Sequence, residues 1–208
     1  MSSAPKHRYT VDEYLAYEAN AERKHEYYDG EIFAMAGTSI DHGRIVLNIA
    51  RILGNSFLDK PCEVFVSEIR VRTSTAKKNL YTYPDLVIIC EKPQLEGSEP
   101  RTLLNPRVLI EVLSPSTEHF DRTAKFKHYK TIPSLKEYVL VSQDEARVEV
   151  FTMINDSAWP EEPLIYSGLE SMATFAAVPC QLQLADIYRN VEFDPTLEIR
   201  RGNPRFDE

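Results

Sequence analysis

Two carboxylates stand beside or inside aliphatic runs of the sequence, where charged residues are uncommon. Glu111 interrupts the run at 109–113, and Asp85 directly precedes the run at 86–89. A carboxylate is rarely buried unless it is paired or binds a metal. Both side chains are therefore expected to have partners, and they could converge on one site if their strands are neighbours.

Carboxylate ligands of this kind suit a hard cation. Mg²⁺ takes one or two carboxylates together with waters and phosphate oxygens of a substrate. The bound ion can stabilise charge on a phosphodiester and generate a hydroxide nucleophile. Simpler interpretations remain open: Asp85 could cap the start of its strand, and Glu111 could form a buried ion pair with Arg70, Arg72 or a lysine.

The segment after Glu111 supplies cations at helical spacing. Asp121 and Lys125 are four residues apart, so on a helix they share a face and form a pair that contributes about 0.3–0.5 kcal/mol. Tyr129 continues that face. Alternatively, Lys125 reaches the two carboxylates and orients or deprotonates an attacking water. Spacing alone favours the solvated helix pair.

The elements that must position these residues follow from periodicity and turn signals. The nearly continuous aliphatic run around Glu111 is typical of an interior strand buried on both faces. Asp29-Gly30 predicts a two-residue type I′ hairpin, and Thr10 with Glu13 matches a helix capping box. The predicted elements are a helix at 11–20, hairpin strands at 24–28 and 31–35, a helix at 41–58, partner strands at 62–72 and 83–90, the strand at 107–113, a helix capped by Ser116 or Thr117 that ends near 131, hairpin strands at 137–142 and 146–153, a strand near 163–167 and a short helix at 184–191. The segments at 73–79 and 91–105 are expected to be polar loops, and the stretch at 172–183 is ambiguous.

Composition is ordinary for a globular protein, with 43% hydrophobic and 27% charged residues among 208. No apolar run approaches the roughly 20 residues of a membrane span, and the first residues form no apolar signal core. The three cysteines, Cys62, Cys90 and Cys180, are far apart and odd in number. They fit reduced thiols in a cytoplasmic protein rather than a disulfide framework or a zinc site. We expect one domain at 1–195 and a flexible tail at 196–208.

The net charge of -8 argues mildly against a nucleic-acid partner. Its distribution is uneven, because residues 101–136 contain seven arginines and lysines against three acidic residues. A polyanion could dock on this segment, although a solvated basic helix face is the commoner meaning of such a cluster.

An ordered set of motifs resembles the Uma-type endonucleases, a group of the PD-(D/E)XK, or restriction-endonuclease-like, superfamily. The set spans about residues 10 to 190 and consists of Glu26 with Asp29-Gly30-Glu31, then His42, Pro84-Asp85, Ile110-Glu111 with the following Val-Leu-Ser-Pro-Ser-Thr, Asp121-Arg122-x-x-Lys125-x-x-x-Tyr129, and Glu137-Tyr138. The resemblance implies a mixed α/β (α+β) fold, in which helices flank a central mixed β-sheet. It also implies cleavage of DNA phosphodiester bonds with Mg²⁺, or Mn²⁺, as cofactor.

Carried over onto this sequence, the resemblance makes Asp85 and Glu111 the catalytic carboxylates that bind metal. Glu26 corresponds to the additional acid found near the metal in many members. The superfamily's lysine is expected two positions after Glu111, where this sequence has Leu113. Some members carry that lysine on the following helix, which makes Lys125 the candidate here. His42, Asp121, Arg122 and Tyr129 match supporting positions, although an isolated histidine at a helix start is more often a cap or a surface contact.

The first hypothesis is therefore a Mg²⁺-dependent endonuclease, and a homodimer is expected because duplex cleavage requires two active sites. The alternative is a non-catalytic module that retains the nuclease fold and binds nucleic acid or protein. The displaced lysine and the acidic net charge favour this alternative. A metal phosphoesterase acting on small molecules would need no basic segment and is the least favoured.

Overall fold

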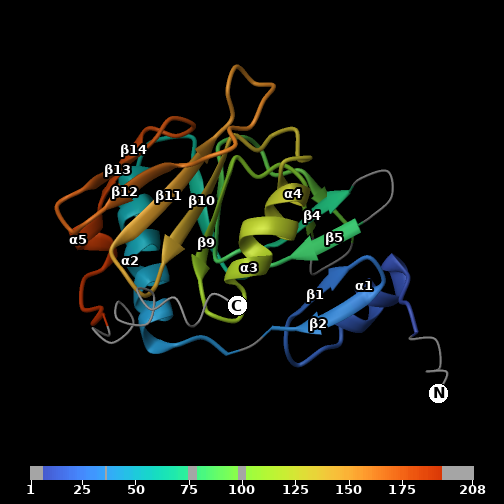
Figure 1. Cartoon of the computed structure of the whole chain (residues 1–208). Coiled ribbons are helices and arrows are strands. Elements are labelled where there is room, and N and C mark those ends of the chain that lie inside the picture. The colour runs from blue at the N-terminus through green and yellow to red at the C-terminus, as the bar shows by residue number, and fades with distance from the viewer. Residues whose placement is uncertain (1–6, 36, 75–78, 98–101, 194–208) are drawn as a thin grey trace.

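The strands that the structure describes form two six-stranded β-sheets and one two-stranded sheet (Figure 1). The computed structural model describes residues 7–35, 37–74, 79–97 and 102–193. Within these residues the central sheet has the order β12-β11-β10-β9-β6-β3, the side sheet has the order β2-β1-β5-β4-β8-β7, and β13 pairs with β14. The bounds are α1 Val11–Glu18, β1 His25–Tyr28, β2 Glu31–Ala34, α2 Ile40–Ser56, β3 Glu63–Val66, β4 Arg70–Ser74, β5 Asn79–Thr82, β6 Leu86–Ile89, β7 Leu95–Glu96, β8 Thr102–Leu103, β9 Val108–Leu113, α3 Glu118–Phe120, the π-helical turn Asp121–Lys125, α4 Phe126–Tyr129, β10 Glu137–Ser142, β11 Arg147–Thr152, β12 Leu164–Ser167, β13 Met172–Phe175, β14 Cys180–Gln183 and α5 Leu184–Ile187.

The two faces of the central sheet pack against different helices, as Figure 1 shows. Every residue of β9 is buried, and the strand lies between the parallel strand β10 and the antiparallel strand β6. Val108, Ile110 and Val112 pack in the core cluster that contains the apolar stripe of α2. Leu109 and Leu113 pack with residues of α4 on the opposite face. Because side chains alternate along a strand, Glu111 points to this second face.

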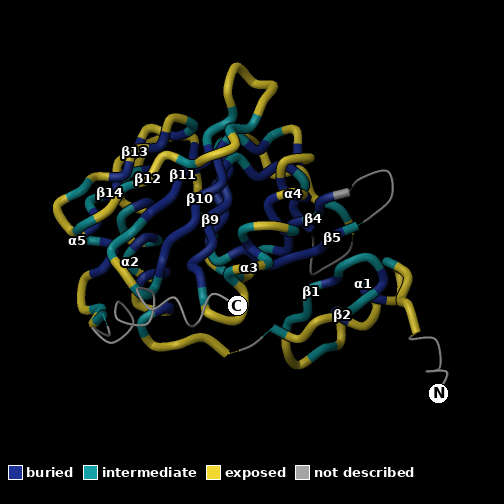
Figure 2. The backbone as a smooth tube through the Cα atoms, in the orientation of Figure 1, coloured by how far each residue is buried: buried dark blue, intermediate teal, exposed yellow. Residues whose placement is uncertain are grey.

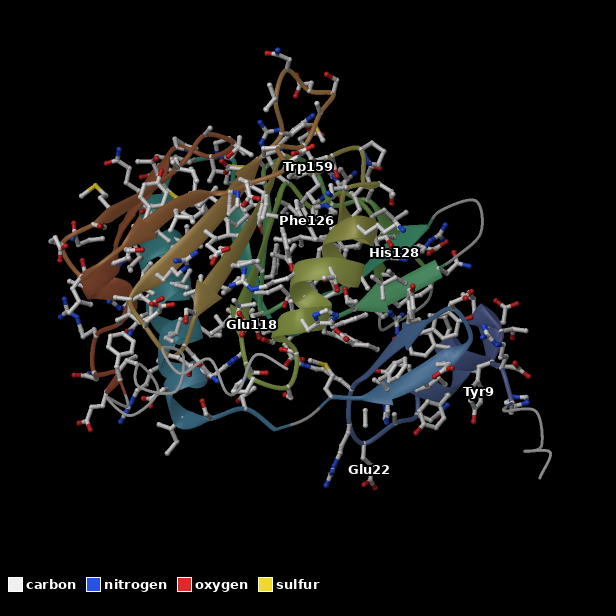
Figure 3. The ribbon with its side chains drawn as sticks, in the orientation of Figure 1. Tyr9, Glu22, Glu118, Phe126, His128 and Trp159 are labelled. Carbon is white, nitrogen blue, oxygen red and sulfur yellow. A yellow bond between two sulfur atoms is a disulfide. The ribbon has the colours of Figure 1, made fainter. Side chains whose placement is uncertain are left out.

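The segment after β9 is helical, as predicted, but it is not one regular helix. Residues 118–129 form two short α-helices separated by the π-helical turn Asp121–Lys125, and Thr117 makes no side-chain cap. The turn is held against the sheet by aromatic packing. The ring of Phe126 stacks on Tyr138 at 5.0 Å and meets Trp159 edge-on at 5.5 Å (Figure 3). π-helical turns are frequent at functional sites.

The hairpin predicted at Asp29-Gly30 is confirmed. Strands β1 and β2 are joined by these two residues, which have φ values of 46° and 92°, as a type I′ turn requires. The capping box that begins α1 is also confirmed. Tyr27 joins the hairpin to α1 and β5, because its ring packs on Tyr14 and Tyr81. Much of β2 remains exposed, as Figure 2 shows.

The prediction of one strand at 62–72 is wrong. Ser67, with φ of 40°, separates β3 from β4, and the two strands enter different sheets. The predicted pairing with the strand after Asp85 holds for β3, which pairs with β6. Strand β4 instead pairs with β5, which was not predicted, and the segment predicted as a loop at 91–105 contains the short strands β7 and β8.

The expectation that all cysteines are reduced thiols is also wrong. Cys62 and Cys90 form a disulfide, whereas Cys180 is free and buried. Cys62 directly precedes β3 and Cys90 directly follows β6, so the pairing of Glu63 with Ile89 brings the two cysteines opposite each other. Among the described residues, no helix has the length and apolar character needed to cross a membrane. The predicted flexible tail at 196–208 lies outside the described residues.

Candidate active site

Asp85 and Glu111 come together because their strands are neighbours. Strand β6 pairs antiparallel with β9 so that Leu86 faces Ile110, and the next positions along this register are Asp85 and Glu111. Oδ2 of Asp85 accepts a hydrogen bond from the backbone nitrogen of Val112 at 2.8 Å. Asp85 therefore caps the start of its strand, as the simpler interpretation proposed. In the same position it lies beside Glu111.

Glu111 is 3% exposed, and its Oε1 contacts two neighbouring side chains. The hydroxyl of Tyr129 donates to this oxygen at 2.9 Å, and Nζ of Lys125 lies 3.2 Å from it. Thr82, which was not predicted to belong to the site, contacts the same tyrosine hydroxyl at 2.8 Å. A buried ion pair is thus present, and its cation is a lysine.

The two arginines considered as partners of Glu111 lie in other interactions. Nε of Arg70 donates to Thr102 at 2.9 Å, and Arg72 pairs with Glu96. Glu111 therefore depends on Lys125 for its positive neighbour.

Lys125 is the centre of a buried charge cluster. Its Nζ lies 3.0 Å from Oδ1 of Asp121, 3.2 Å from Oε1 of Glu111 and 3.3 Å from Oε1 of Glu26. The helix pair of Asp121 with Lys125 exists, but it is not solvated, because Asp121 is 2% exposed and Lys125 is 5% exposed. The solvated pair that spacing alone favoured is therefore wrong, and the alternative, in which Lys125 reaches Glu111, is the arrangement observed.

The cluster carries more negative than positive charge. Burial raises the pKa of Glu111 well above its ordinary value; Lys125 opposes this shift, and Asp121, Asp85 and Glu26 add to it. Burial disfavours the charge on Lys125, but Glu111 and Glu26 outweigh that effect and raise the pKa of its ammonium well above the ordinary value. Such a cluster favours any additional cation.

His42, which matches a supporting position of the family, contacts Asp85 and is not a surface residue. It lies in the first turn of α2 and is 7% exposed. Its backbone nitrogen donates to Oγ of Ser39 at 3.0 Å, and its Nε2 lies 3.0 Å from Oδ1 of Asp85. The N-cap of α2 thus fixes the histidine that holds the first carboxylate.

Arg122 points away from the carboxylates. Its guanidinium donates to both oxygens of Glu149 on β11, at 2.7 and 3.0 Å, and to Glu118 at 2.8 Å. It therefore fixes the π-helical turn to β11 of the central sheet.

A pocket of about 640 Å³ opens over these residues. Its lining includes Glu26, Asp85, Glu111, Asp121, Lys125 and His42. It also includes the aromatic residues Tyr28, Phe33 and Phe120, which were not predicted as site residues. Tyr28 and Phe33 could have been predicted from the sequence. The two-residue turn sets the hairpin register, which places Phe33 opposite Glu26 and Tyr28 on the same face as Glu26.

Comparisons with known proteins identify the family of this chain and a solved structure of the same fold. Residues 11–186 match the profile of the Uma2 family, which is described as "Putative restriction endonuclease". The chain belongs to the Uma2 family. Two uncharacterized proteins of Synechocystis sp. are its relatives. The protein sll1609 is 39% identical over 169 residues, covering 81% of this chain and 94% of the relative. The protein slr1290 is 33% identical over 157 residues, covering 76% and 80%.

A solved structure shares the fold of this Uma2 chain. The crystal structure of "a putative nuclease belonging to DUF820" from Anabaena variabilis superimposes with a TM-score of 0.65 and 20% identity, covering 86% of this chain and 97% of that one. The predicted family and the predicted restriction-endonuclease-like fold, a mixed sheet flanked by helices, are confirmed.

The departure at position 113 has a structural reason in this Uma2 chain. Leu113 is 4% exposed and belongs to the core cluster that joins β9 to α4. Lys125, from the following helical segment, lies beside Glu111 instead. The role predicted for Lys125 stays a prediction, and the structure gives it the required proximity.

The donor set fits a hard divalent cation with few protein ligands. Among the described residues, no three His, Cys, Asp or Glu side chains are gathered closely enough to hold an ion by themselves. Mg²⁺ does not need such a cage, because it usually keeps waters and binds through one or two carboxylates and substrate phosphates. Asp85 and Glu111 are two oxygen donors that line one pocket of surplus negative charge, so they suit this mode of binding.

Proposed function

We propose that this Uma2 chain is a Mg²⁺-dependent endonuclease that hydrolyses phosphodiester bonds of DNA. The observation that supports the proposal best is the convergence of Asp85, Glu111 and Lys125 on one pocket from three separate segments of the chain. Membership of a family described as "Putative restriction endonuclease" agrees with the same reaction class.

Asp85 and Glu111 would hold the ion, with Glu26 at the edge of the site. A bound Mg²⁺ supplies charge stabilisation on a phosphate and lowers the pKa of a water. His42 and the backbone of Val112 fix Asp85, and Tyr129 fixes Glu111. Burial and the charge on Glu111 raise the pKa of Tyr129 well above its ordinary value, so its hydroxyl keeps the proton that it donates.

Lys125 acts as a charged orienting group rather than as a base. The carboxylates around it raise the pKa of its ammonium, so it remains protonated at neutral pH. From this position it would hold a non-bridging phosphate oxygen or the attacking water in line with the phosphorus. Hydrolysis then joins the water oxygen to phosphorus and breaks one P–O ester bond, and the leaving alkoxide takes up a proton.

The test is cleavage of plasmid and linear DNA by the purified protein with Mg²⁺ or Mn²⁺. The wild type should nick or cut DNA, and Asp85→Ala and Glu111→Ala should each be inactive while retaining the wild-type circular dichroism spectrum. Activity that survives both substitutions would overturn the assignment. Salt-sensitive binding of DNA without cleavage under either metal would instead support the binding-module hypothesis.

A further inference from the structure

Aromatic side chains stand on both sides of Glu26 on the hairpin. In the register of β1 and β2, Glu26 pairs directly with Phe33, and side chains of such a pair lie on the same face of the sheet. Tyr28 follows two positions after Glu26 and shares that face. All three residues line the pocket, and Phe33 is 47% exposed.

A third ring faces the hairpin from the helical segment. Phe120, at the end of α3, lies 6.1 Å from the ring of Tyr28 in an edge-on arrangement. Nζ of Lys125 lies 5.9 Å from the same phenylalanine ring. Tyr28, Phe33 and Phe120, here called the aromatic frame, therefore border the charge cluster directly, whereas exposed aromatic residues elsewhere, such as Tyr17, lie apart from this pocket.

The charge of the pocket decides which part of a nucleic acid the pocket itself can bind. Its described lining has four carboxylates and a single lysine, and that lysine is already paired with three of the carboxylates. Duplex DNA is bound mainly through Lys and Arg contacts to its phosphates. Proteins that bind single strands also stack bases on aromatic side chains. The lining of this pocket has several groups of the second kind, and its one group of the first kind is the already paired Lys125.

Stacking requires a base whose flat face is free. In a duplex both faces are covered by neighbouring base pairs, and an enzyme must extrude a nucleotide to reach them. We propose that the aromatic frame stacks an unpaired nucleobase next to the scissile phosphate, so that the preferred substrate is single-stranded DNA or a duplex with an unpaired nucleotide. The inference rests on the proposed nuclease function for its scissile bond, but base binding by the frame can be measured without cleavage.

The experiment uses three fluorescein-labelled oligonucleotides of one sequence: a single strand, a matched duplex and a duplex with one unpaired nucleotide. Binding is measured by fluorescence anisotropy with EDTA, and cleavage is measured with Mg²⁺. The variants are Phe33→Ala, Phe33→Leu and Phe33→Trp. Tyr17→Ala is the matched control, because Tyr17 is an aromatic residue of similar exposure, 48%, outside the pocket.

The single strand should bind the wild type about tenfold more tightly than the matched duplex, and cleavage should follow the same order. Phe33→Ala and Phe33→Leu should each lose about tenfold in affinity for the single strand, since leucine retains apolar area but has no flat ring. Phe33→Trp and Tyr17→Ala should bind like the wild type. Comparing the affinities for the single strand and for the duplex with an unpaired nucleotide shows which of these two kinds of DNA supplies the stacked base.

Two outcomes separate the failure of this inference from the failure of the proposed function. Equal binding and cleavage of all three oligonucleotides, unchanged by Phe33→Ala, would overturn the inference and leave the nuclease function standing. Binding that prefers unpaired DNA and depends on Phe33, without cleavage under either metal, would overturn the nuclease function and support the base site.

Discussion

Nε2 of His42 lies 3.0 Å from Oδ1 of Asp85, so the first turn of α2 is joined to the start of β6 inside the pocket. Ile45, Ile49 and Leu53 of the same helix are fully buried against the central sheet. The apolar stripe of α2 therefore positions a histidine against a proposed metal ligand.

Replacing this histidine should weaken the site without unfolding the protein. His42→Ala is expected to lower DNA cleavage and Mg²⁺ affinity by about 10–100-fold, the usual effect of removing a group that orients a ligand. A titration of cleavage rate against Mg²⁺ concentration measures both quantities. His42→Asn, which can still donate a hydrogen bond to Asp85, should recover part of the loss. A wild-type Mg²⁺ titration for His42→Ala would contradict the positioning role.

Removing the lysine should affect stability as well as activity. Lys125→Met leaves the buried carboxylates of Glu111 and Asp121 without their cation, and breaking a buried pair in this way costs about 3–5 kcal/mol. We expect a lower urea midpoint at pH 7 and loss of cleavage. Lys127→Met is the matched control, since Lys127 is an exposed lysine of the same helical segment. Equal midpoints for the two variants would show that the charge cluster does not stabilise the fold.

Glu111 should make the stability of the metal-free protein depend on pH. Burial raises the pKa of its carboxyl above the ordinary value of 4.5, so the folded state binds this proton more tightly than the unfolded state. The protonated carboxyl of Glu111 contributes its full stabilisation below pH 4.5. This stabilisation is lost as the pH rises through the pKa that Glu111 has in the folded protein. Without metal, Glu111→Gln should melt like the wild type at pH 4 and several degrees higher at pH 8.

Added Mg²⁺ should reverse that order at pH 8. Saturation about 100-fold above Kd contributes about 2.7 kcal/mol, which raises Tm by roughly 5–10 °C for a chain of this size. Only the wild type should gain this shift. Equal shifts for Glu111→Gln would argue against Glu111 as a metal ligand.

Glu149 should respond to pH in the opposite direction. Burial would raise its pKa, but the hydrogen bonds donated by Arg122 and Arg147 outweigh burial and lower it. The stability that Glu149 contributes is present above its unfolded pKa of about 4.5 and is lost as the pH falls through the lower folded value. Glu149→Gln should lose about 2 kcal/mol at pH 7, with the difference from wild type shrinking toward pH 3 in urea titrations. A constant difference would exclude an ionised Glu149 as its cause.

Local sequence patterns predicted the elements that carry most of the charge cluster. The aliphatic run around Glu111, the turn at Asp29-Gly30 and the stripe of α2 are all visible at short range, and each formed as expected. Sequence pattern and spacing made Asp85 and Lys125 candidates, and the family resemblance implied their roles. The structure brings both beside Glu111.

The other features of the fold and of the site depended on contacts between residues that are far apart in the sequence. The alternation changes phase between Val66 and Ile69, but only the assignment of β3 and β4 to different sheets shows that this change ends one strand and begins another. The π-helical turn depends on Arg122 reaching Glu149 on β11. The aromatic frame required the two strands of the hairpin to be viewed in register with each other rather than one after the other.

The packing of Tyr27 against Tyr14 and Tyr81 limits how this hairpin can change in evolution. Because neighbours on a strand face opposite ways, the burial of Tyr27 obliges Glu26 and Tyr28 to point into the pocket. A single-residue insertion between Glu26 and Tyr27 would send the carboxylate to the opposite face. Substitutions in the exposed parts of the hairpin should therefore be tolerated among relatives, whereas insertions or deletions of one residue within β1 should be excluded.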